Sequence, residues 1–166
     1  MQQTWITRRA VALAATTALT AGGALALAAP SVAKTTARSA AKTTNITVTE
    51  HAITDTEQPL APGGKDKAGD ILTFTNPVFN QADTNRVGHD EGFCTRLNVK
   101  NGVWECLWTT FLDGGQITVQ GPFYDTKNST LSVTGGTGTF AGARGQMGLV
   151  SKNGGKEYLF KFRLQG

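Results

Sequence analysis

Apolar and polar positions alternate along most of the chain from about residue 45 onward. In residues 115–123, Ile117, Val119 and Phe123 fall on one face, while polar side chains occupy the other. Residues 156–165 repeat the pattern with aromatic residues and a leucine on one face. Alternation with a period of two, bounded by Gly, Asn, Asp and Pro, predicts antiparallel β-strands that each bury one face.

Eight segments of this kind are expected to form strands. They cover about residues 45–53, 69–79, 92–99, 103–112, 115–123, 130–134, 140–149 and 156–165. Most connections are short and rich in Gly and Asn, as in hairpins. The pattern predicts an all-β protein, either a sandwich or an eight-stranded antiparallel closed barrel. A closed barrel is favoured because it exposes no sheet edge. Its interior can be filled by side chains or can hold one small ligand.

The first 33 residues have the pattern of a secretory signal peptide. Arg8 and Arg9 precede an Ala-rich apolar segment over 10–29, and small residues follow at 31–33. The paired arginines also resemble a twin-arginine signal, so export by either the Sec or the twin-arginine route is expected. A membrane anchor is the alternative, but glycines and threonines dilute the segment and no charged stop follows it.

Cleavage after Ala33 would leave a flexible leader over 34–44 and one domain over 45–166. Loss of two arginines lowers the formal net charge from +4 to +2, and the remaining basic residues are scattered. This distribution argues against nucleic-acid binding. We expect a secreted, extracellular protein without a stable membrane anchor after signal cleavage.

Cys94 and Cys106 flank the predicted turn over 100–102 almost symmetrically. In an exported chain, an even cysteine count favours a cross-strand disulfide over free thiols. A simple two-residue turn would put the pair out of register, so a bulge or a longer loop is required. The alternative is a free thiol that lines the pocket. The spacing of Cys and His matches no zinc template, and no metal is expected.

Two polar positions have more than one interpretation. Asn76 shares a strand face with Leu72 and Phe74, so it is either a polar group inside an apolar pocket or the cap of a turn before a proline. Asp90 and Glu91 are neighbours that would point to opposite faces of a strand, and we interpret them as part of a solvated turn.

Several short segments share their order and spacing with a known family. They are Gly69-Asp70 with Phe74-x-Asn76, Val87-Gly88, Gly92-x-Cys94, residues 117–122, and Val133–Phe140 with Gly145-Gln146. Over about residues 45–165 the chain resembles plant allene oxide cyclases, and residues 135–145 equally resemble dirigent proteins. The resemblance implies an eight-stranded barrel, and a homotrimer is the oligomer it suggests.

The resemblance also implies a site. Allene oxide cyclases rearrange an unsaturated fatty-acid epoxide to a cyclopentenone inside the barrel. Their water-holding Asn matches Asn76 and their pocket Cys matches Cys94, whereas their pocket Glu falls at Thr47, a second Asn at Thr49 and a Tyr at Phe123. A threonine cannot supply the negative charge that stabilises a developing cation.

Other positions depart from both families. Glu50 lies three residues from Thr47, on the opposite face of a regular strand. Dirigent proteins have Asp-Pro where this chain has Asn76-Pro77, and an Arg where it has His89. Oxidation of Cys94 would remove the family's pocket thiol.

We therefore expect an exported barrel that binds an apolar small molecule and acts as a cofactor-free isomerase or cyclase, or as a stereo-directing protein. Its expected pocket residues are Thr47, Thr49, Phe74, Asn76, Cys94 and Phe123, with Asn76 the candidate catalytic residue. The alternatives are a non-catalytic carrier and a secreted interaction protein whose barrel is filled by its own side chains. A barrel without a cavity near Asn76 would eliminate both ligand hypotheses.

Overall fold

The computed structural model describes residues 42–165, so the expected signal segment and most of the leader lie outside the described residues. The strands are β1 (Thr43–His51), β2 (Thr56–Gln58), β3 (Ile71–Asn80), β4 (Arg86–Asn98), β5 (Val103–Leu112), β6 (Gly115–Tyr124), β7 (Ser129–Gly136), β8 (Arg144–Lys152) and β9 (Glu157–Gln165). A three-residue 3-10 turn, η1 (Gly138–Phe140), follows β7. Within the described residues, no helix is long and apolar enough to cross a membrane.

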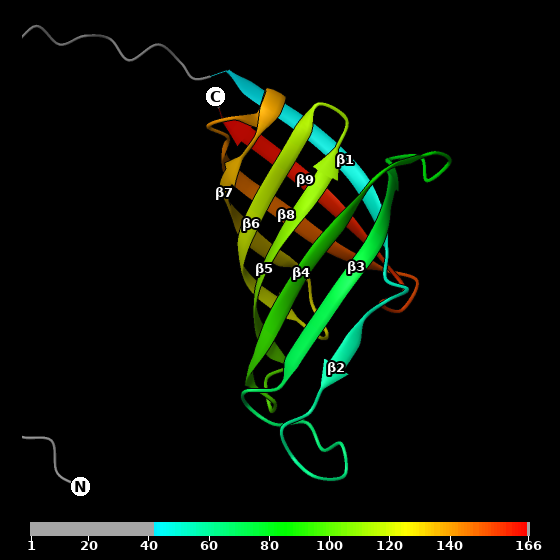
Figure 1. The fold of residues 1–166 in the computed structure, drawn as a ribbon, viewed down its shortest axis with the longest axis vertical. Coiled ribbons are helices and arrows are strands. Elements are labelled where there is room, and N and C mark those ends of the chain that lie inside the picture. The colour runs from blue at the N-terminus through cyan, green and yellow to red at the C-terminus, as the bar shows by residue number, and fades with distance from the viewer. Residues whose placement is uncertain (1–41, 166) are drawn as a thin grey trace, which may run out of the picture. The chain divides into compact units, whose positions relative to one another are not determined.

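Eight strands close into an antiparallel barrel, as the alternation predicts (Figure 1). Neighbouring strands follow the chain from β3 to β9, β9 pairs with β1, and β1 returns to pair with β3. The short β2, which the sequence pattern did not indicate, adds to the free side of β3. The seam between β1 and β3 is brief: it pairs only Val48, Thr49 and Glu50 with the end of β3. Additional contacts across this seam therefore matter for closure.

Strand β4 begins at Arg86, well before the predicted residue 92. Its interior positions include Gly88, Asp90 and Gly92, which supply no apolar side chain and therefore no alternation signal. Gly92 is required sterically, since a Cβ atom there would lie 2.2 Å from the Cβ of Trp108 on β5. The missing side chain makes room for the indole inside the barrel.

Apolar side chains fill most of the barrel interior. Ile117, Leu131, Met147 and Phe162 are almost completely buried and come from β6, β7, β8 and β9. None of these four lines the cavity described below. The barrel is thus a packed core that leaves a limited space among other side chains.

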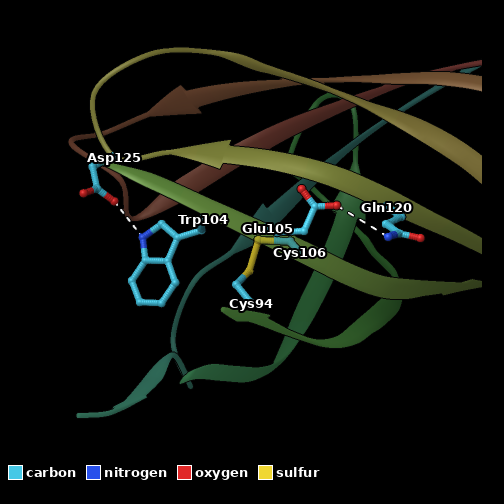
Figure 2. The surroundings of a disulfide bond; sticks show 6 residues. All are labelled: Cys94, Trp104, Glu105, Cys106, Gln120 and Asp125. Carbon is cyan, nitrogen blue, oxygen red and sulfur yellow. Dashed lines mark hydrogen bonds between the residues drawn. A yellow bond between two sulfur atoms is a disulfide. The ribbon is translucent and has the colours of Figure 1, made fainter. Parts of the chain in front are cut away.

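The predicted disulfide joins Cys94 of β4 to Cys106 of β5 (Figure 2). The two residues are directly opposite each other, and a register shift between Arg96 and Asn98 brings them into line. The disulfide and the irregularity needed to form it are both confirmed. The described residues contain no free cysteine.

A buried arginine ties the connections at one end of the barrel to β4. Arg96 is 5% exposed and pairs with Asp66 at 2.8 Å and with Asp125 at 2.6 Å. Its guanidinium carbon lies 3.9 Å from the ring centroid of Trp104, whose Nε1 donates to Asp125 (Figure 2). These contacts hold the β2–β3 loop and the β6–β7 turn against the barrel.

Candidate functional site

A cavity of about 40 Å³, partly open to the surface, lies inside the barrel. Its wall combines five aromatic rings, two leucines, the disulfide and two carboxyl groups. These residues are Phe74, Trp108, Phe123, Tyr158, Phe160, Leu72, Leu149, Cys94, Cys106, Glu50 and Asp55. Pockets that enclose drug-sized ligands are several-fold larger. The cavity as it stands accommodates a small molecule or one end of a larger one.

Three of the predicted pocket residues, Phe74, Cys94 and Phe123, lie in this wall. Cys94 contributes a disulfide sulfur and not the free thiol that the resemblance implies. Thr47, Thr49 and Asn76 do not line the cavity, which corrects their predicted placement. Side chains alternate along β1, so these two threonines have the parity opposite to that of the pocket residue Glu50.

Glu50 places a carboxyl group in the cavity wall and is only 4% exposed. Its Oε1 accepts a hydrogen bond from Nδ2 of Asn76 at 2.5 Å, and its Oε2 has no hydrogen-bond partner within residues 42–165. Burial raises the pKa of Glu50 to about 9; nearby Asp90 and Asp55 add to the increase and the Asn76 hydrogen bond opposes it. The group is therefore neutral at pH 7. Because Oε1 is an acceptor, the acid proton resides on Oε2.

Asn76 is almost fully buried and fastens the segment after β1 to β3. Besides its bond to Glu50, Nδ2 donates to Oδ1 of Asp55 at 2.7 Å. Oδ1 of Asn76 accepts hydrogen bonds from the backbone N–H groups of Ile53 at 3.0 Å and Thr54 at 2.9 Å, and from Oγ1 of Thr54 at 3.1 Å. Both amide hydrogens are thus in use. The structure makes Asn76 a positioning residue, in contrast to the predicted water-holding or catalytic role.

Asp90 is a second buried carboxyl group that the sequence interpretation missed. It is 0% exposed within β4, and its Oδ1 accepts from the backbone N–H of Asn76 at 3.3 Å. Burial raises the pKa of Asp90 to about 8, against the hydrogen bond from Asn76. The solvated-turn interpretation of Asp90 and Glu91 is wrong, although Glu91 does point to the exposed face. Because side chains alternate along a strand, Asp90 shares a face with the buried Cys94 four residues later. This spacing would have placed Asp90 inside the barrel.

The backbone at Asn76 also decides between its two predicted interpretations. Strand β3 continues through Pro77 to Asn80, so Asn76 does not cap a turn. Its backbone lies opposite Asp90, and its side chain points toward β1 and the following segment. Asn76 is therefore inside the barrel, as one interpretation predicted, but it lies behind the cavity wall and does not line the cavity.

Tyr158 supplies a phenol to the wall from β9. Its ring meets Phe123 edge-on, with the ring centroids 5.7 Å apart. Burial, together with the negative charges of Glu50, Asp55 and Asp125, raises the pKa of Tyr158 to about 12. The phenol therefore stays protonated under ordinary conditions. It lies beside Phe123, the position at which the resemblance implies a Tyr.

A possible metal-ligand group lies apart from the cavity wall. The potential ligand atoms of His51, Asp83 and Glu157 are all within 4.8 Å of one another. Nε2 of His51 forms a 2.8 Å hydrogen bond with Asp83. This hydrogen bond accounts for the arrangement without a metal ion.

The cavity provides acid–base chemistry in an apolar surrounding. A neutral carboxylic acid whose proton faces a cavity can donate a hydrogen bond or a proton to a bound molecule. After losing that proton, the carboxylate can stabilise positive charge on the same molecule. The aromatic rings shape the space and make most of its wall apolar. Glu50 is the side chain best placed for this chemistry.

Comparisons with known proteins agree with the barrel and with the resemblance seen in the sequence. The model of the allene oxide cyclase family matches residues 39–166. A structure titled pyocyanin demethylase superposes with a TM-score of 0.63 at 25% identity, covering 72% of this chain and 99% of that one. A pterocarpan synthase dirigent protein superposes with a TM-score of 0.60 at 18% identity, covering 75% and 83%. An exo-specific intermolecular Diels-Alderase gives a TM-score of 0.60 at 13% identity, covering 75% and 99%.

The buried acids predict that stability falls as pH rises. The folded-state pKa of Glu50 exceeds its unfolded value, so its contribution is fully present below pH 4.5 and is lost as pH rises through about 9. Between pH 5 and 8 we expect the free energy of unfolding to fall by up to about 1.4 kcal/mol per pH unit for each such group. Urea unfolding across this range measures the slope. Glu50→Gln should reduce the slope to the contribution of Asp90, and the same slope in the variant and wild type would contradict the assignment.

Removal of the Asn76 amide should destabilise the barrel seam. Asn76→Ala leaves buried partners on β1 and on residues 53–55 unpaired, with an expected loss of about 3 kcal/mol in the free energy of unfolding. Asn101→Ala, at an exposed turn, is the matched control and should change stability by less than about 0.5 kcal/mol. Equal effects of the two substitutions in urea unfolding would show that the amide does not fasten the seam.

Proposed function

The chain belongs to the allene oxide cyclase family, and we propose that its barrel binds an apolar small molecule and acts on it as a cofactor-free cyclase or isomerase, or as a stereo-directing protein. The observation that carries the proposal is the buried carboxyl group of Glu50, whose Oε2 is unpaired within residues 42–165 beside an aromatic-lined cavity. An unpaired buried acid costs stability.

The carboxyl group and the phenol that the family resemblance implies come from other positions in this chain. Glu50 replaces a carboxyl group expected at Thr47, and Tyr158 on β9 replaces a phenol expected at Phe123. The two rings of Phe123 and Tyr158 are in edge contact, so the phenol lies in the region where the resemblance implies one. The missing groups are therefore no argument against catalysis.

In the proposed mechanism, the apolar body of the substrate packs against Trp108 and Phe74, whose rings meet edge-on with centroids 6.0 Å apart. Oε2–H of Glu50 donates its proton to the substrate, or its carboxylate stabilises the positive charge that develops during rearrangement. Asn76 holds the carboxyl group in place through Oε1. The rigid wall restricts the conformations of the substrate and so directs the stereochemistry of the product.

A non-catalytic carrier is the second candidate. Two observations favour it: Cys94 is in a disulfide, and Asn76 has no amide hydrogen left to hold a reacting water. A carrier would use the same rings to bind its ligand and would release it unchanged. The two candidates differ in whether Glu50 contributes to a change in the ligand.

Two further proposals accompany the function. The first is that the protein is exported, because residues 1–33 have the pattern of a signal peptide. These residues lie outside the described residues. A homotrimer is supported by an apolar pair on the outer face of the barrel, since Phe93 on β4 is directly opposite Leu107 on β5 and both are exposed. Exposed apolar pairs of this kind are common where subunits associate.

Conversion of a bound ligand by wild type and Glu50→Gln tests the proposal. Native mass spectrometry and denaturing extraction identify the molecule that co-purifies, and chiral chromatography follows its conversion. Because Gln keeps the shape and the hydrogen bond but cannot transfer a proton, we expect turnover of the bound ligand to fall at least about 100-fold. Glu105→Gln, on the outer face of β5, is the matched control and should retain wild-type turnover.

Equal conversion by wild type and Glu50→Gln would remove Glu50 from the mechanism. Release of the extracted molecule unchanged by every variant would favour the carrier.

A further inference from the structure

We propose that the cavity selects ligands whose small apolar body carries a basic or permanently charged nitrogen, which Glu50 and Asp55 face. This inference rests on the proposed function, because it names the class of ligand for the same cavity. It follows from the charge, the aromatic lining and the hydrogen bonding of the wall.

The carboxyl groups around Asn76 have no cationic partner within residues 42–165. Glu50 and Asp55 accept from its side-chain amide, and Asp90 accepts from its backbone N–H. The ion pairs of the described residues involve other acids, namely Asp66, Asp83, Glu91, Asp125 and Glu157. No Lys, Arg or His is among the residues that line the cavity. A bound cation would be the first positive charge beside these carboxyl groups, and it would favour ionisation of Glu50, which burial otherwise holds neutral.

The remaining wall suits a cation with an apolar body. Trp108 lies between Phe74 and Phe160, with ring centroids 6.0 Å and 5.5 Å away, and Phe123 meets Tyr158 across the wall. Faces of aromatic rings attract cations electrostatically, and the attraction strengthens when water is excluded. Aromatic rings next to carboxylates are the general means by which proteins hold substituted ammonium groups.

A basic ligand and a permanent cation would use the proton of Glu50 differently. With an amine, the Oε2–H bond breaks and an N–H bond forms, leaving an ammonium ion beside the carboxylate. With a quaternary nitrogen, Glu50 releases its proton to solvent when the ligand binds. Asp55, Asp90 and Tyr158 face Glu50 from the segment after β1, from β4 and from β9. Asp55 and Asp90 are carboxyl groups that can favour a cation, whereas the protonated phenol of Tyr158 carries no charge. A ligand with only an acceptor oxygen would use Oε2–H but would leave Asp55 without a cationic partner, with only the hydrogen bond from Asn76.

Two probes of the same shape and different charge test the inference. N-methylpyridinium is a permanent cation, and toluene is its neutral isostere with the same number of heavy atoms. Isothermal titration calorimetry of each probe with the full-length protein, in two buffers of different ionisation enthalpy, gives affinity and proton release together. We expect N-methylpyridinium affinity to rise up to about tenfold per pH unit between pH 6.5 and 8.5, with release of one proton, because binding competes with protonation of Glu50. Toluene affinity should not change with pH.

Glu50→Gln isolates the contribution of this carboxyl group. The variant should lose most of the pH dependence and bind the cation at least tenfold more weakly at pH 8.5, while its toluene affinity is retained. Retained toluene binding also shows that the variant is folded. Glu105→Gln should match wild type with both probes.

The possible results separate the inference from the proposed function. Toluene binding without binding of the cation would overturn the inference and leave the apolar pocket intact. Cation binding with the same pH dependence in Glu50→Gln as in wild type would also overturn it. Failure of both probes to bind wild type would contradict the proposed function together with the inference.

Discussion

The hydrogen bond between the Asn76 amide and the Glu50 carboxyl group is the contact on which the rest of the structure depends. It crosses the short seam between β1 and β3, where three residue pairs close the barrel. The same amide also binds Asp55 and the backbone after β1. One side chain therefore closes the barrel, orders the segment at the cavity and orients the acid in its wall. Fold and chemistry share a single set of contacts.

The hydrogen bond positions a neutral acid in the cavity wall, at a site that differs from the one that the family resemblance implies. Burial away from cations keeps Glu50 protonated against the effect of the Asn76 hydrogen bond, and because that bond is made to Oε1, the proton is assigned to Oε2. The resemblance supplied the family and the barrel, but it placed the carboxyl position at Thr47. Strand parity excludes that position, because side chains at 47 and 50 leave β1 on opposite faces.

Most of the fold could be predicted from the sequence, and the residues that were missed share a physical cause. Alternation was clear in β9, where each inward position is apolar, and in β6, where Ile117, Val119 and Phe123 share the inward face, and the cysteine spacing required the irregularity that β4 contains. The alternation of apolar and polar residues is absent over residues 86–92, where glycine and Asp90 occupy the interior positions of β4. A polar group at a buried position interrupts the alternation of apolar and polar residues from which burial is predicted. The site is built from such groups, so hydrophobic patterning alone could not locate it.

The most direct test of this account is the ionisation of Glu50. Carbon-13 NMR of protein labelled at glutamate carboxyl carbons, with Glu50→Gln to assign the resonance, follows the group through a pH titration. The account predicts a midpoint near 9, with the acid neutral at pH 7. A midpoint near the ordinary value of 4.5 would mean that the cavity holds a carboxylate at neutral pH, and it would contradict both the proton on Oε2 and the chemistry assigned to it.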